Sequence, residues 1–139
     1  MAMISQVSVG VSDCDRAARF WAAALGYARR PPRYPGDEWI VLAPPPGVPG
    51  PALAMDLSET RAEEFPRVHL DLTAGGRDLD GEVERLVGLG ARRVDWPYYP
   101  VQLEPGASPY VVLADTEGNR FCVSGRLRPA GPEGPASTD

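Results

Sequence analysis

Apolar and polar residues alternate along several short segments of the chain, and Gly, Pro, Asn or Asp residues bound most of these segments. This alternation predicts β-strands with one buried face. In two other segments the apolar residues recur at helical spacing, which predicts amphipathic helices over 14–25 and 78–89. The expected strands lie within 3–13, 27–30, 37–44, 52–58, 67–74, 91–97, 110–115 and 120–125.

Both helices carry end signals in the sequence. Ser12 or Asp13 can accept a hydrogen bond from the first turn of the first helix, and Gly26 follows its last apolar residue. Gly90 ends the second helix in the same way. Trp21 lies among the apolar positions of the first helix, so we expect it in the core.

The order of elements is strand, helix and three strands, and it occurs twice. We therefore predict an α+β fold with tandem βαβββ modules, over 4–58 and 66–125, whose curved mixed sheet forms a cup with the helices outside. These modules make up one domain over 1–125. The Pro- and Gly-rich segment 126–139 is expected to be a flexible tail.

Composition excludes several functions. The net charge of -5 argues against a nucleic-acid partner, since binding to a phosphate backbone requires clustered basic residues. No apolar run is long enough for a membrane span, and no signal peptide is recognisable at the start. Cys14 and Cys122 are far apart and are read as reduced thiols, which favours a cytoplasmic protein.

Polar residues occupy one face of the outer strands in both modules. His69, the one histidine of the chain, alternates with Val68 and Leu70, which are expected to face the second helix. Asp71 and Thr73 share the face of His69. Similar polar faces are formed by Gln6 with Ser8 and by Arg120, Cys122 and Ser124. These polar faces favour a wet or ligand-filled cleft over a dry core.

The segment 95–110 is too long for a tight hairpin and carries Trp96, Tyr98 and Tyr99 among several prolines. Aromatic rings offer flat apolar area to a planar ligand, so the segment could form a wall or lid of the cleft. Packing on its own domain, or a dimer contact, is the alternative. Trp39 is a further candidate for the lining of the first half of the cleft.

Four stretches of the sequence resemble the vicinal oxygen chelate superfamily, which includes glyoxalase I, the bleomycin-resistance proteins and the extradiol dioxygenases. They are ISQVSVGVSDCDRAARFWAAALGY, VHLDLTA, EVERLVGLGARRV and VVLADTEGNRFCV. The last is similar to the closing strand of the family, where D-x-x-G-N precedes a ligand position. The resemblance spans about 4–125 and implies the fold more strongly than the chemistry, because this superfamily supports many activities.

The resemblance also implies metal-ligand positions on four strands. They fall on Gln6, Asp56, His69 and Cys122, with Met55 as the alternative to Asp56 if the strand slips by one residue. Both glutamates of the family are absent, and a thiolate suits softer ions than the hard ions that favour oxygen ligands. We therefore expect no cofactor, and a divalent metal at these four residues is the alternative. A second alternative makes Cys122 a nucleophile activated by His69.

Two functions follow from the resemblance. The first is a small-molecule-binding protein with a polar cleft and an incomplete metal tetrad. The second is a metal-dependent lyase or isomerase of the glyoxalase type. A homodimer is expected in both cases, and the cleft could form within one chain or between modules exchanged across the dimer. The expected ligand-binding residues are Gln6, Asp56, His69, Asp71, Trp96, Tyr99, Arg120 and Cys122.

Overall fold

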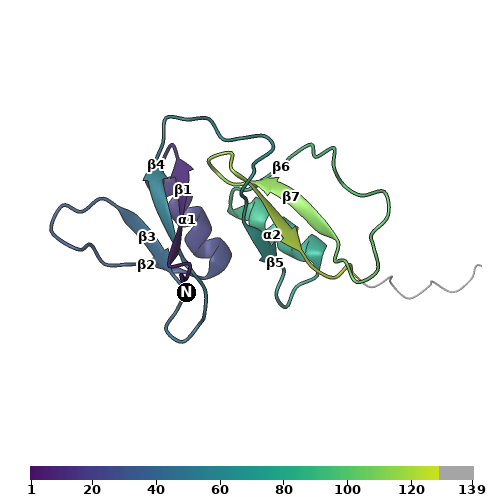
Figure 1. Ribbon diagram of the computed structural model, residues 1–139, viewed down its shortest axis with the longest axis horizontal. Helices are drawn as coiled ribbons and strands as arrows, with labels where there is room; N and C mark the ends of the chain where they lie inside the picture. The colour runs from purple at the N-terminus through teal and green to yellow at the C-terminus, as the bar shows by residue number, and fades with distance from the viewer. Residues whose placement is uncertain (129–139) are drawn as a thin grey trace, which may run out of the picture.

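The β-α-β-β-β unit occurs twice along the chain, as the sequence predicts (Figure 1). A computed structural model of the protein describes residues 1–128. The first module contains β1 (Gln6–Val11), α1 (Cys14–Leu25), β2 (Ala28–Arg29), β3 (Ile40–Ala43) and β4 (Ala52–Leu57). The second contains β5 (Asp71–Thr73), α2 (Leu79–Leu89), β6 (Arg92–Arg93), β7 (Tyr110–Ala114) and β8 (Arg120–Ser124).

Each module forms its own four-stranded mixed sheet. The strand orders are β1-β4-β3-β2 and β5-β8-β7-β6, so each module has the same arrangement. The first and last strands of each module pair in parallel, and the remaining pairs are antiparallel. The α+β fold class and the tandem modules are thus confirmed. The expected single curved sheet is two sheets within residues 1–128, and Figure 1 shows them side by side.

Helix α1 begins and ends where its end signals predict. The side chain of Asp13 accepts a hydrogen bond from the Arg16 N–H, and Gly26 adopts the left-handed conformation with φ 69°. Asp78 caps α2 by accepting from the Gly81 N–H, so α2 starts one residue later than expected. No helix in residues 1–128 is long and apolar enough to cross a membrane.

One hydrophobic core joins the two modules. Trp21 on α1 lies edge-on to Phe121 on β8, with ring centroids 5.1 Å apart, and both side chains are buried. Helices α1 and α2 also contact each other. Both helices lie on the core side of the sheets. Within residues 1–128 no helix covers the opposite faces.

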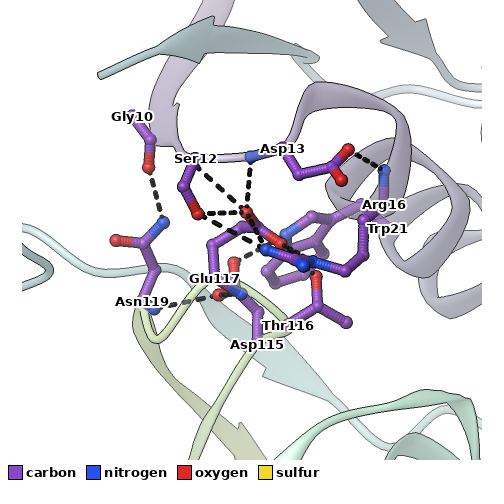
Figure 2. A network of polar contacts seen from close by, with 9 residues as sticks. All are labelled: Gly10, Ser12, Asp13, Arg16, Trp21, Asp115, Thr116, Glu117 and Asn119. Atoms are coloured by element: carbon purple, nitrogen blue, oxygen red, sulfur yellow. Dashed lines mark hydrogen bonds and ion pairs between the residues drawn. The ribbon is translucent and has the colours of Figure 1, made fainter. Parts of the chain in front are cut away.

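A polar network also links the modules (Figure 2). The carboxylate of Glu117, in the turn between β7 and β8, accepts hydrogen bonds from the backbone N–H groups of Ser12 and Asp13 and from the Arg16 guanidinium. Burial of Glu117 acts to raise its pKa, but these bonds and one from Thr116 outweigh burial and lower the pKa to about 2. Glu117 therefore holds the turn against the start of α1 as a carboxylate.

The expected strand over 67–74 is only partly formed. Strand β5 is restricted to Asp71–Thr73, although the Leu70 carbonyl accepts a hydrogen bond from the Cys122 N–H. The chain bends at Arg67 and Val68, and Val68 is 84% exposed. The prediction that Val68 faces α2 is therefore wrong, because Pro66 and the bend interrupt the alternation before it reaches the sheet.

The segment after β8 is described only as far as residue 128. The Arg126 carbonyl accepts a hydrogen bond from the Leu79 N–H, and Arg128 forms an ion pair with Asp78. Residues 126–128 thus contact the start of α2. The rest of the expected flexible tail, 129–139, lies outside the described residues.

Candidate functional site

Strand alternation places a set of polar side chains on the helix-free face of the second sheet. Asp71 pairs with Cys122 in the parallel ladder of β5 and β8, so their side chains share a face. His69 precedes Asp71 by two residues and points to the same face. Leu72 and Val123, one residue further along each strand, pack in the core. The predicted face of His69 is therefore the one that the structure shows.

His69, Asp71 and Cys122 form a compact cluster. The His69 Nδ1 lies 2.8 Å from the Asp71 Oδ1 and 4.0 Å from the Cys122 Sγ. A carboxylate at this distance accepts a hydrogen bond from Nδ1, which leaves Nε2 free to accept one from a ligand. The His69 side chain is 38% exposed, so a ligand can reach it.

Cys122 is a poor nucleophile in this cluster. Burial raises the pKa of its thiol to about 11, and the negative charge of Asp71 and a hydrogen bond to that carboxylate act in the same direction. The thiol is therefore protonated near neutral pH, when a nucleophilic cysteine would need a lowered pKa. The cluster favours Cys122 as a neutral contact residue.

Two cavities meet at His69. The first has a volume of about 410 Å³ and lies over the helix-free face, where its lining includes Asp71, Trp96, Tyr110 and Cys122. The second, of about 450 Å³, lies between β1, the linker 60–68 and the start of β8, and its lining includes Arg120. Because His69 lines both cavities, a ligand in either one can contact the imidazole.

The aromatic residues of the segment 95–110 divide between two roles. Trp96 lines the cavity over the sheet, and its ring lies 5.6 Å from the ring of Tyr98. The hydroxyl of Tyr99 instead accepts a hydrogen bond of 2.8 Å from the Val112 N–H, and the Tyr99 ring packs on Tyr110. Trp96 thus contributes to the wall of the cleft, whereas Tyr99 supports the sheet from the side.

Arg120 lies at the edge of this site with its charge unpaired. Its guanidinium is 5.7 Å above the ring of Phe65, and its Nη1 is buried with no hydrogen-bond partner among residues 1–128. The Nε1 of Trp96 is likewise buried without a partner in this part of the chain. Each of the two cavities therefore has a lining residue with a buried donor that lacks a partner, Arg120 in one and Trp96 in the other.

Gln6 and Asp56 do not join this cluster. Both lie on the helix-free face of the first sheet, where Gln6 pairs in register with Ala52 and its side chain donates to the Ser8 hydroxyl. Asp56 accepts a hydrogen bond of 3.1 Å from the Trp39 Nε1. Asp56 and Trp39 border a third cavity, of about 500 Å³. The face preference for Asp56 over Met55 agrees with the structure, since Met55 is buried in the core.

The four ligand positions implied by the resemblance are therefore not assembled within one chain. Among residues 1–128 the one group of three His, Cys, Asp or Glu donors close enough to share a metal ion is His69, Asp71 and Cys122, whose ligand atoms lie within 4.8 Å of one another. The structure thus combines two of the four expected ligands with Asp71. The separation has a simple cause, because the two sheets do not share a ladder.

Phe65 and Tyr110 belong to the site but were not expected there. Phe65 lies in the linker between the modules, where no periodicity assigns a side chain to a face. Tyr110 is the first residue of β7 and pairs with Ser124, so the alternation of β7 contained the signal for its face. Its placement could have been predicted from the register of β7 and β8.

Comparison with known proteins supports the architecture. The sequence profile of the family described as "Glyoxalase-like domain" matches residues 6–124. No curated protein matches the sequence. Many solved structures share the fold, and the three described next are each less than 25% identical to this chain.

The first is a mutant of the fosfomycin resistance protein FosX from Listeria monocytogenes, in complex with Mn(II) and 1S,2S-dihydroxypropylphosphonic acid (14% identity, 91% of this chain and 92% of that chain covered, TM-score 0.68). The second is a glyoxalase/bleomycin resistance protein/dioxygenase family enzyme from Burkholderia phytofirmans PsJN (19% identity, 91% and 100%, TM-score 0.63). The third is TnmS3, an antibiotic binding protein from Streptomyces sp. CB03234 (19% identity, 89% and 95%, TM-score 0.57).

Proposed function

The chain belongs to the glyoxalase-like domain family, and we propose that it is a small-molecule-binding protein that works without a metal tetrad. The proposed binding site is the helix-free face of the second sheet, around His69, Asp71 and Cys122. Trp96 and Arg120 contribute from the segment after β6 and from the start of β8.

One observation carries this proposal: two cavities of about 410 and 450 Å³ meet at a partly exposed imidazole. Ligand sites in proteins are concave, mostly apolar, and oriented by a few polar groups, and cavities of this size hold drug-sized molecules. The Asp71 carboxylate fixes the orientation of the His69 ring by accepting from Nδ1. The ring is therefore ready to accept a hydrogen bond at Nε2.

Two structures with the same fold are those of proteins that bind small molecules, in agreement with this function. The FosX structure contains a small phosphonic acid, and TnmS3 is described as an antibiotic binding protein. Gln6 and Asp56 lie on the other sheet, so a four-residue metal site would require a different arrangement of the modules, such as exchange across a dimer.

The test is nuclear magnetic resonance titration of the labelled protein with fosfomycin, bleomycin and a library of aromatic fragments. We expect at least one compound to shift the amide signals of His69, Asp71, Tyr110 and Cys122. His69→Ala should weaken that compound while leaving the fold intact. Shifts confined to the first sheet, or binding unaffected by His69→Ala, would contradict the proposed site.

A metal-dependent lyase or isomerase is the second candidate, because His69, Asp71 and Cys122 offer three ligand atoms within 4.8 Å. An imidazole, a carboxylate and a thiolate fit zinc better than the hard ions that prefer oxygen. The fit is incomplete, since structural zinc sites use four protein ligands and this cluster offers three, which would leave a fourth position open. A bound zinc would act as a Lewis acid that polarises a substrate oxygen, while Asp71 orients His69.

Elemental analysis separates the two candidates. Protein purified without a metal-affinity tag should contain far less than one equivalent of zinc, manganese, nickel or iron. A full equivalent that is lost in His69→Ala would favour the enzyme.

A further inference from the structure

We propose that the ligand of the His69 cleft is an amphipathic anion, with a flat apolar part on Phe65, Trp96 and Tyr98 and an anionic oxygen group at the guanidinium of Arg120. This inference rests on the proposed binding function and adds the chemical class of the ligand. It follows from the juxtaposition of a half-buried guanidinium, one of whose donors has no partner among residues 1–128, with a partly exposed aromatic cluster.

The first step concerns Arg120. Its Nη1 is buried, yet Arg120 has no hydrogen bond or ion pair from its side chain within residues 1–128. A buried donor that lacks a partner destabilises a fold, and a charged donor does so more strongly. The guanidinium carbon lies 5.7 Å from the centroid of the Phe65 ring, and this cation–π contact does not require the N–H groups to donate hydrogen bonds. Those N–H groups match the geometry of a carboxylate, phosphonate or sulfonate.

The second step concerns the aromatic cluster. The rings of Phe65, Trp96 and Tyr98 lie 5.4 to 5.6 Å from one another, at tilted or edge-on angles. Phe65 and Tyr98 are nevertheless 49% and 65% exposed. Trp96 also carries a buried Nε1–H without a partner in the described chain. Such a cluster offers apolar area together with one further donor for an acceptor on the ligand.

The third step concerns the charges around Arg120. Arg61 and His69 line the same cavity, as do the carboxylates of Glu63 and Asp115. Asp115 already accepts hydrogen bonds from Trp21 and from the backbone N–H groups of Glu117 and Asn119. Asp115 is therefore directed toward the module interface. Arg61 and Glu63 are exposed, whereas Arg120 has a buried donor without a partner among residues 1–128.

The test compares two fluorescent probes that share the same ring systems. The first is 8-anilinonaphthalene-1-sulfonate, and the second is N-phenyl-1-naphthylamine, which lacks the sulfonate. We expect the folded protein to bind both, and Arg120→Gln to weaken the sulfonate probe by about tenfold or more without changing the neutral probe. Arg120→Lys, which keeps the charge, should retain part of the preference.

Arg19→Gln is the matched control, because Arg19 is an exposed arginine on α1 and its replacement changes the net charge equally. Circular dichroism should show that all variants remain folded. If wild type binds both probes but Arg120→Gln weakens neither or both equally, the ligand class is wrong and the binding function stands; water would then satisfy the guanidinium. If wild type binds neither probe, the binding function itself fails.

Discussion

The indole N–H of Trp21 donates a hydrogen bond of 3.0 Å to the Oδ2 of Asp115, and both side chains are buried. This bond connects helix α1 of the first module to the turn before β8 in the second. Burial raises the pKa of Asp115, while the bonds from Trp21 and from two turn N–H groups act to lower it. A buried carboxyl group at a module interface depends on such donors.

Trp21→Phe should therefore destabilise the protein by roughly 2–4 kcal/mol, because it removes a buried donor and leaves a cavity. Trp39→Phe is the matched control: it also removes a bond from an indole to a carboxylate, that of Asp56, but Trp39 is 37% exposed. Its cost should stay below about 1 kcal/mol. Urea unfolding measures both, and equal losses would show that the burial of the Trp21 bond is unimportant.

The free energy of unfolding should fall in acid partly because of Glu117. Its pKa is lowered to about 2 in the folded protein, so the unfolded chain binds the proton more tightly. Its stabilising contribution is fully present above about pH 4.5, the ordinary range for Glu, and is lost as pH falls toward 2. Glu117→Gln should be less stable at pH 7 and should lose less stability on acidification, as followed by unfolding free energies between pH 7 and 2.

Glu59→Gln, an exposed residue of the linker, serves as the control for Glu117. The pKa of Asp115 is raised in the folded protein, so its effect on stability has the opposite pH dependence to that of Glu117 and favours the folded state at low pH. Asp115 is present in all three proteins, but the charge of Glu117 contributes to its raised pKa, so Glu117→Gln also removes that contribution. Parallel pH profiles for wild type and Glu117→Gln would contradict the role assigned to this carboxylate.

A charge introduced at Leu70 should destabilise the protein far more than a charge introduced at Val68. Leu70 packs against the core, so Leu70→Asp should destabilise by at least about 3 kcal/mol or prevent folding. Val68→Asp should change stability by less than about 0.5 kcal/mol, because Val68 is exposed. Thermal melts of the two variants measure this, and a large loss with Val68→Asp would mean that the strand extends further than β5.

The Cys122 thiol should alkylate slowly at pH 8, since its pKa is raised to about 11. Asp71→Asn should accelerate the reaction by removing the adjacent negative charge. The measurement is the rate of iodoacetamide labelling in a Cys14→Ser background, with Asp80→Asn, an exposed position on α2, as the control. Fast labelling of Cys122 in the parent protein would restore the nucleophile hypothesis.

A homodimer remains a prediction. The helix-free face of the second sheet carries a cavity, and large apolar side chains such as Leu57 and Val101 are exposed in the single chain. Light scattering at micromolar concentration should give about twice the chain mass of 14.9 kDa. A mass equal to that of one chain would contradict the dimer and would mean that the binding site is complete within a single chain.

Local rules were sufficient for most of the fold. Asp13 and Gly26 fix the ends of α1 through bonds and dihedral angles that depend on their own residue types. The alternation of β8 correctly placed Cys122 opposite Phe121, because a strand reverses its side chains at every residue. Such features need no knowledge of distant residues.

The site was only partly predictable because it depends on distant contacts. Gln6 and His69 occupy corresponding strand positions, but their separation depends on how two sheets pack. The contact of Arg120 with Phe65 joins β8 to the linker between the modules, and no sequence period relates the two. Asp71 was expected to bind ligand, yet its bond to His69 could be found only from coordinates.

The bond between Tyr99 and Val112 has a consequence for how copies of this chain can meet. Strand β6 is only two residues long and ends at Arg93, which pairs with Leu113, so Val112 lies just beyond the ladder. The Tyr99 hydroxyl occupies the place where another strand would add, and Arg92 and Arg93 bring positive charge to the same margin. This margin is thereby protected from edge-to-edge aggregation. A partner copy that pairs through a sheet edge would therefore have to use another edge strand, β1, β2 or β5.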